Sequence, residues 1–118
     1  MNWFSAQQFC WDNGGYLAEI LSAEEEARID RFLPSDLDYW IGLSDSATEG
    51  TWRWLESHRE AEYTNWGPEQ PDNSISNNPD GEDCAAKWGN DAGELWNDFR
   101  CEAEGIHALC QVLKEEEI

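Results

Sequence analysis

Residues 65–84 read NWGPEQPDNSISNNPDGEDC, and this stretch does more than any other to define the chain. Between Asn65 and Glu82 it contains three prolines, two glycines and four asparagines, with almost no apolar side chains. This composition predicts an irregular loop, because proline and glycine interrupt helices and strands. A loop of this length inside a compact domain is uncommon and is usually either functional or disordered. We therefore expect a binding loop or a disordered segment at this point of the chain.

The segments around the loop have the patterns of helices and strands. Ser5 is a suitable N-cap for a helix that runs to about Asn13. Residues 22–25 (SAEE) match a capping box and predict a second helix, with Phe32 on its apolar face, that ends before Pro34. Short strands are expected at 39–43, 51–55, 84–88, 95–98 and 107–113. Two helices followed by short strands around one long loop predict an α+β domain.

Length and charge narrow the classes of partner. The 118 residues suffice for one compact domain, and 26 Asp and Glu against 7 Lys and Arg give a formal charge of −19. Such a charge disfavours binding to DNA, RNA or an anionic membrane. Aromatic residues make up 13% of the chain, which favours a folded domain over a disordered acidic tail. No apolar run is long enough for a membrane span, and the first residues do not form a signal peptide, so a mature or trimmed fragment is expected.

The chain has an even number of cysteines, which allow three pairings. They are Cys10, Cys84, Cys101 and Cys110. Disulfides and an oxidising compartment fit a small domain of this kind, and reduced thiols in a cytosolic protein are the alternative. A zinc site is disfavoured because no C-x-x-C occurs and neither His58 nor His107 has finger spacing from a cysteine pair.

Oxygen-bearing side chains gather in three short segments. They occur at 69–73 inside the long loop, at 82–83 just before Cys84, and at 96–98 shortly before Cys101. Calcium takes six to eight oxygen ligands, and carboxylates that repel one another can pack together around such an ion. The alternative is a solvated acidic loop, since acidic residues are common throughout this chain.

Short motifs spread along the chain resemble those of the C-type lectin-like domain. In chain order they are Trp3-x-x-Ala6-x-x-x-Cys10, Gly14-Gly15-x-Leu17-Ala18, Trp40-Ile41-Gly42-Leu43, Glu49-Gly50-x-Trp52-x-Trp54, Asn65-Trp66, Gln70-Pro71-Asp72, Glu82-Asp83-Cys84, Trp96-Asn97-Asp98, Cys101 and Cys110. The resemblance extends over nearly the whole chain and implies a single lectin domain over residues 1–118. We expect the strand with which family members usually begin to be absent from this chain.

The resemblance implies a fold and a disulfide pattern. The expected fold is the α+β double-loop fold, with two helices, two small antiparallel sheets and a long calcium-binding loop. Cys10 is expected to pair with Cys110, and Cys84 with Cys101.

The resemblance also implies calcium ligands. The principal calcium, which in the family also binds the sugar, would be held by Gln70, Asp72, Glu82, Asn97 and Asp98. A second calcium would be held by Asp45, Glu49, Asn73 and Asp83. At the position of Asn73 many family members have aspartate, so this second set has one negative charge fewer.

The sugar preference is expected from Gln70-Pro71-Asp72. In the family this order accompanies galactose-type sugars, including N-acetylgalactosamine, whereas Glu-Pro-Asn accompanies mannose. An amide donates hydrogen bonds and a carboxylate accepts them, so the two orders present opposite partners to the sugar hydroxyls. Relatives often place an aromatic ring after the triplet, but here residues 73–78 contain none. Trp88 is the candidate replacement, with a buried core tryptophan as the favoured alternative.

The expected function is calcium-dependent carbohydrate binding outside the cell, without catalysis. The sequence contains no Gly-x-Ser-x-Gly, and a glycosidase-like carboxylate pair is the enzymatic alternative. Within the same family the alternative is recognition of a protein surface or of ice. We also expect weak homodimerisation through an exposed edge of the strand at 107–113.

Overall fold

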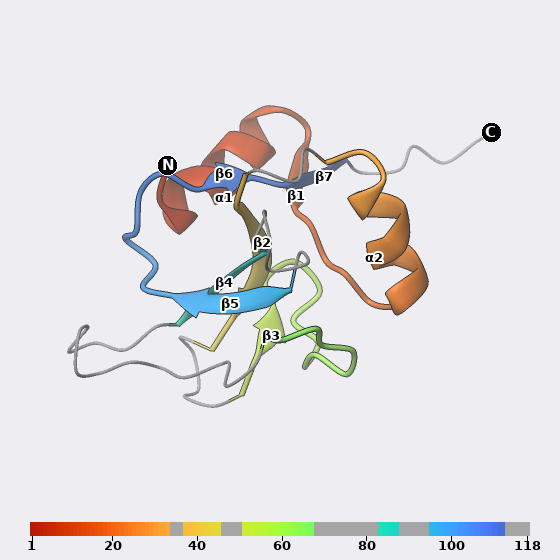
Figure 1. The fold of residues 1–118 in the computed structure, drawn as a ribbon. Coiled ribbons are helices and arrows are strands. Elements are labelled where there is room, and N and C mark those ends of the chain that lie inside the picture. The colour runs from red at the N-terminus through yellow and green to blue at the C-terminus, as the bar shows by residue number, and fades with distance from the viewer. Residues whose placement is uncertain (34–36, 46–50, 68–82, 88–94, 113–118) are drawn as a thin grey trace.

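The computed structural model describes residues 1–33, 37–45, 51–67, 83–87 and 95–112, and the structural statements below concern these residues. In chain order the helices and strands are α1 (Trp3–Asp12), β1 (Gly15–Leu17), α2 (Ala23–Asp30), β2 (Tyr39–Ser44), β3 (Arg53–Trp54), β4 (Cys84–Lys87), β5 (Trp96–Phe99), β6 (His107–Ala108) and β7 (Cys110–Val112). The two helices lie on different sides of the strands (Figure 1). This arrangement confirms the predicted α+β class.

The starts of both helices are fixed by side-chain caps. Ser22 caps α2 as predicted, because its Oγ accepts a hydrogen bond from the Glu25 backbone N–H at 3.1 Å. The predicted cap of α1 is wrong. Asn2 is the N-cap, and its Oδ1 accepts a hydrogen bond from the Ser5 N–H at 2.8 Å. The helix therefore begins at Trp3, before the predicted cap.

The apolar face predicted for α2 is also partly wrong. The helix ends at Asp30, so Phe32 lies beyond it and is 84% exposed. Ile29 packs against the core, but the buried side chain of α2 is the charged Glu26. The burial of this carboxylate was not predicted from the sequence.

The strands form two sheets. In the smaller one, β1 and β7 are antiparallel, with Leu17 opposite Cys110. In the larger one the order β3-β2-β4-β5 is antiparallel throughout, and the short β6 pairs with β2 in parallel. The two small sheets were predicted, but the strand expected at 107–113 is two strands, β6 and β7, which belong to different sheets.

Tryptophans supply much of the core. Trp3 and Trp40 are buried in one cluster, and Trp54 and Trp96 are buried in the other. The Trp3 indole N–H donates to the Ile41 carbonyl at 3.0 Å, which fixes the start of α1 against β2. Large aromatic rings pack on β2, β4 and β5, so these three strands form a rigid support for the residues at their ends.

Two disulfides close the fold. Cys10 is bonded to Cys110 and joins α1 to β7, and Cys84 is bonded to Cys101 and joins β4 to the segment after β5. Both expected pairings are confirmed. Each bond is worth about 2–4 kcal/mol through its constraint on the unfolded chain. No helix among the described residues is long and apolar enough to cross a membrane.

Candidate calcium and carbohydrate site

The structure describes four of the nine candidate calcium ligands. They are Asp45, Asp83, Asn97 and Asp98. The other five, Gln70, Asp72, Glu82, Glu49 and Asn73, lie outside the described residues, as does the candidate sugar-stacking residue Trp88. Their placement therefore stays a prediction.

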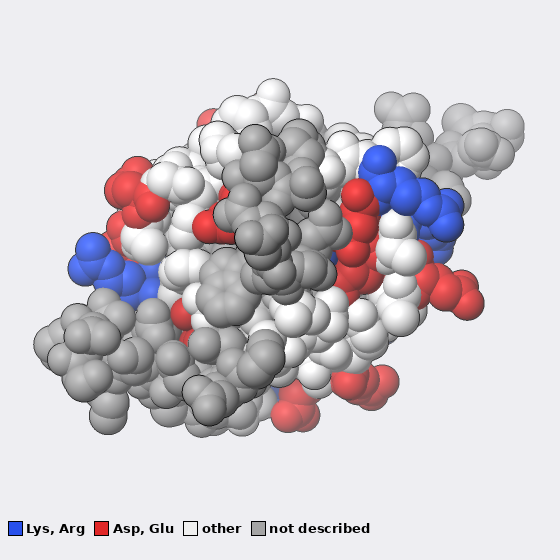
Figure 2. Space-filling view, viewed as in Figure 1, with Lys and Arg blue, Asp and Glu red and all other residues white. Residues whose placement is uncertain are grey.

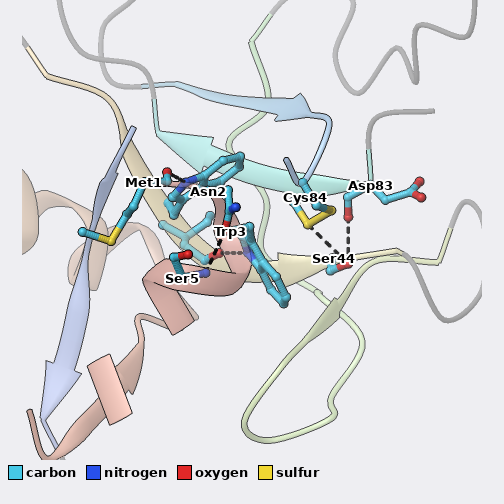
Figure 3. Close-up of a disulfide and its surroundings, with 10 residues drawn as sticks. Met1, Asn2, Trp3, Ser5, Ser44, Asp83 and Cys84 are labelled. Carbon is cyan, nitrogen blue, oxygen red and sulfur yellow. Dashed lines mark hydrogen bonds between the residues drawn. A yellow bond between two sulfur atoms is a disulfide. The ribbon is translucent and has the colours of Figure 1, made fainter. Parts of the chain in front are cut away.

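Asp45 and Asp83 are brought together where β2 ends and β4 begins. The Asp83 carbonyl accepts hydrogen bonds from the Asp45 N–H at 3.0 Å and from the Ser44 hydroxyl at 2.7 Å. The neighbouring Cys84 disulfide holds the chain at this point, and the Asp83 carboxylate points away from it (Figure 3). The two candidate ligands of the second calcium thus occupy adjacent chain segments.

The Asp83 carboxylate has an unusual environment. Its Oδ1 is buried and has no hydrogen-bond partner among the described residues. A buried carboxylate oxygen without a donor is costly, and a bound cation can offset that cost. The Asp45 side chain is also buried, with 2% of its residue surface exposed. An all-oxygen donor set of this kind suits a hard cation such as calcium.

Asn97 and Asp98 are consecutive residues of β5, so their side chains leave opposite faces of the strand. Asn97 is opposite Ala86 and Asp98 is opposite Ala85, so each polar side chain has a small residue of β4 as its cross-strand neighbour. Both are buried, and Asp98 is completely so. The strand predicted at 95–98 contains both residues, and the structure places both on β5.

Within the described residues, no group of three or more His, Cys, Asp or Glu side chains converges as a complete metal site. The described portion therefore contributes Asp45 and Asp83, where β2 ends and β4 begins, and Asn97 and Asp98 on β5. Any further ligands have to come from the residues outside it. Of the two histidines, His58 lies in the exposed segment after β3 and His107 lies in β6.

A buried polar network lies beside this site, and it was not predicted from the sequence. Glu26 accepts hydrogen bonds from the Tyr63 hydroxyl and from the Trp96 indole N–H, each at 2.7 Å, and it also pairs with the Lys87 ammonium. Lys87 lies 3.1 Å from a carboxylate oxygen of Asp30 as well. Burial and the hydrogen bond to Glu26 raise the pKa of Tyr63 well above its ordinary value. The sequence signal for this network was a lysine directly after Cys84-Ala85-Ala86, because a charged residue in a buried strand is rare and needs a partner.

The surface is acidic around these elements. Acidic side chains are scattered over the described part of the face in Figure 2, and the basic ones are confined to its left and right edges. The described part of this face therefore offers no continuous basic surface for a polyanion, in agreement with the formal charge of −19.

Comparisons with known proteins agree with this architecture. The family model described as the lectin C-type domain matches residues 1–112. A perlucin-like protein of Mytilus galloprovincialis is 34% identical over 113 residues, which are 92% of this chain and 69% of that protein. The C-type lectin domain family 4 member F of Mus musculus is 37% identical over 105 residues, but the match covers 84% of this chain and only 18% of that protein.

Solved structures show the same fold. The carbohydrate-recognition domain of the mouse scavenger receptor C-type lectin matches with a TM-score of 0.77 and 39% identity, over 86% of this chain and 75% of that one. The domain of cow CD23, in a structure described as containing a GlcNAc2Man3 oligosaccharide, matches with a TM-score of 0.81 and 27% identity, over 97% and 82%. A calcium-independent type II antifreeze protein matches with a TM-score of 0.72 and 29% identity, over 87% and 72%. The chain therefore belongs to the C-type lectin domain family and has the C-type lectin fold.

Proposed function

We propose that this domain binds carbohydrate through a calcium ion held by Gln70, Asp72, Glu82, Asn97 and Asp98. C-type lectin domains are generally carbohydrate binders and generally not enzymes. The observation that carries the proposal is the placement of Asn97 and Asp98, both buried, on β5 opposite two alanines. The buried Oδ1 of Asp83, which has no hydrogen-bond partner among the described residues, supports a cation in the same region. Asp83 forms the proposed second site with Asp45, Glu49 and Asn73.

The proposed site combines coordination with hydrogen bonding. A bound calcium ion supplies open coordination positions for two neighbouring sugar hydroxyls. The side-chain amide of Asn97 donates a hydrogen bond to one hydroxyl, and the carboxylates accept hydrogen bonds from the hydroxyl protons. Because an amide only donates through its nitrogen and a carboxylate only accepts, the arrangement of these groups selects the orientation of the sugar.

We propose galactose or N-acetylgalactosamine as the preferred sugar, on the order Gln70-Pro71-Asp72. Trp88 is proposed to stack on the apolar face of the sugar. The test is retention on immobilised galactose in calcium, followed by elution with a chelator, with free galactose and free mannose as competitors. We expect galactose to elute the protein at a lower concentration than mannose. Retention that persists in the chelator would contradict calcium-mediated binding, and preferential elution by mannose would contradict the sugar assignment.

A second candidate is recognition of a protein surface or of ice without sugar. It is favoured by the match to an antifreeze protein described as calcium-independent. Thermal hysteresis measured in the presence of a chelator separates ice binding from sugar binding, because a sugar-binding domain has none.

The proposed setting is extracellular, since two disulfides persist best in an oxidising compartment. We also propose weak self-association through the edge of β7, where Val112 is largely exposed. Light scattering at high concentration tests it, and a monomer at all concentrations would contradict it.

A further inference from the structure

The buried network around Glu26 connects separate parts of the chain at one carboxylate. Glu26 comes from α2, Lys87 from the last residue of β4, Trp96 from the first residue of β5, and Tyr63 from the segment after β3. Glu26 is 3% exposed and Lys87 is 1% exposed. Hydrogen bonds to a charged acceptor are stronger than neutral ones, and a low-dielectric interior strengthens them further. The carboxylate therefore fixes three donors relative to one another.

Two of these donors lie at one end of the strand pair that carries the candidate ligands. Lys87 is directly opposite Trp96 in the β4–β5 register, and Asn97 and Asp98 follow Trp96 directly. In Figure 1, α2 stands beside the sheet at the end where β5 begins. The Glu26 carboxylate therefore accepts a hydrogen bond from the indole of Trp96, the residue that precedes Asn97. On the neighbouring strand, β4 pairs with both Asn97 and Asp98.

The third donor, the Tyr63 hydroxyl, connects the segment before residue 68 to Glu26. Tyr63 packs edge to face on the Trp96 ring, with ring centroids 5.7 Å apart. The Trp96 backbone also makes two hydrogen bonds to this segment. Its N–H donates to the Asn65 carbonyl at 2.7 Å, and its carbonyl accepts from the Gly67 N–H at 2.8 Å. Trp96 is thus held by its ring, its indole nitrogen and its backbone.

We propose that Glu26 is a positioning residue for the calcium site, acting through Trp96 on Asn97 and Asp98. The inference rests on the proposed function, because it concerns the geometry of the same ligands. Metal ligands need to be held within about 0.5 Å of their working positions, and the groups that orient them affect affinity about 10- to 100-fold. Glu26→Gln retains the size of the side chain but replaces an acceptor oxygen with a donor NH2 group. The three hydrogen bonds then lose their charged acceptor, and either the Tyr63 hydroxyl has to accept instead of donate or Lys87 and the Trp96 indole face an NH2 group, so the hold on the indole weakens.

The test is a calorimetric titration of calcium alone into the folded protein. We expect Glu26→Gln to raise the calcium Kd by about tenfold. Glu24→Gln is the matched control, since Glu24 is exposed on the same helix and its replacement removes the same charge. Leu17→Ala controls for stability, because Leu17 is buried in the other core cluster and its truncation destabilises the fold without touching the network. Both controls are expected to retain the wild-type Kd.

A second readout reports the network directly. In a nitrogen–proton correlation spectrum, the Trp96 indole N–H is expected to shift in Glu26→Gln and to stay in place in Glu24→Gln. Tyr63→Phe removes a single donor and keeps the ring, so it serves if Glu26→Gln does not fold, and we expect a smaller rise of the calcium Kd in it. A wild-type Kd in the folded Glu26→Gln or, failing that, in Tyr63→Phe overturns the inference. An equal loss in Leu17→Ala also overturns it. Absence of calcium binding in the wild-type protein overturns the proposed function, and the inference with it.

Discussion

Lys87→Met is expected to destabilise the domain strongly, although methionine fills nearly the same space. The Lys87 ammonium is buried and contacts both Glu26 and Asp30. Without it, the Glu26 carboxylate stays buried with two neutral donors, the Tyr63 hydroxyl and the Trp96 indole N–H. Breaking a buried ion pair by removing one partner typically costs about 3–5 kcal/mol. Because the two donors remain, we expect a cost near the lower end, about 3 kcal/mol.

The measurement is thermal and urea unfolding at neutral pH without calcium. A loss of about 3 kcal/mol lowers the Tm of a domain of this size by roughly 10–15 °C. The urea midpoint is expected to fall with an unchanged m value, since the surface exposed on unfolding stays the same. Arg28→Met on the exposed side of α2 is the control and is expected to stay within about 0.5 kcal/mol of the wild type.

The double variant Glu26→Gln with Lys87→Met completes the argument. It removes both charges, so it is expected to be more stable than the sum of the single losses predicts, by about 1–3 kcal/mol. A Lys87→Met protein whose free energy of unfolding lies within about 1 kcal/mol of the wild-type value would refute the reasoning, because the unpaired Glu26 carboxylate would then cost much less than expected. Strict additivity in the double variant would refute it as well.

Three further predictions concern calcium, pH and sugar choice. Calcium at ten times its Kd should stabilise the domain by about 1.4 kcal/mol, and a chelator should remove the gain; an unchanged Tm in calorimetry would count against a calcium site. Burial and Glu26 raise the pKa of Tyr63 above its ordinary value near 10, so the contribution of Tyr63 to the free energy of unfolding is complete below pH 10 and is lost as the pH rises above it. Plots of the free energy of unfolding against pH for the wild type and Tyr63→Phe should therefore differ in slope only above pH 10. Equal slopes above pH 10 would contradict this. Exchange of Gln70→Glu with Asp72→Asn retains the net charge and the ligand count, so calcium binding should persist while preference moves from galactose toward mannose by about tenfold or more, as measured on a glycan array.

Features set by neighbouring residues could be predicted from the sequence, and those set by distant contacts could not. Ser22 and Glu25 form their cap within one turn of chain, so the start of α2 was predictable. The start of α1 depends on Trp3, whose backbone N–H donates to the Cys101 carbonyl and whose indole donates to Ile41. Those contacts favour Asn2 over Ser5 as the cap, although both residue types are suitable.

The division of 107–113 into two strands has a similar cause. The Leu109 N–H donates to the Trp40 carbonyl, and the Leu109 carbonyl accepts from the Ala18 N–H. The chain therefore passes from β2 to the neighbourhood of β1 at this residue, and no local pattern marks the transition.

At the candidate site, the family motifs predicted Asn97 and Asp98, and the structure places both on β5. The family motifs did not indicate the buried ion pair of Glu26 and Lys87. Each of these residues has a charge that suits an exposed position, and only the packing of α2 against the start of β5 turns the two charges toward each other.

The most direct test of the calcium-dependent site is a calorimetric calcium titration of the wild type and of Asp98→Asn. Asp98 is completely buried on β5, and asparagine has the same shape, so the variant should fold. We expect the wild type to bind with a Kd of about 10⁻⁴–10⁻³ M, the range of extracellular calcium modules. Asp98→Asn should lose the binding event of the principal site, because it lacks a ligand charge there, while the proposed second site does not include Asp98. Equal binding in the two proteins, or none in the wild type, would contradict the proposed site.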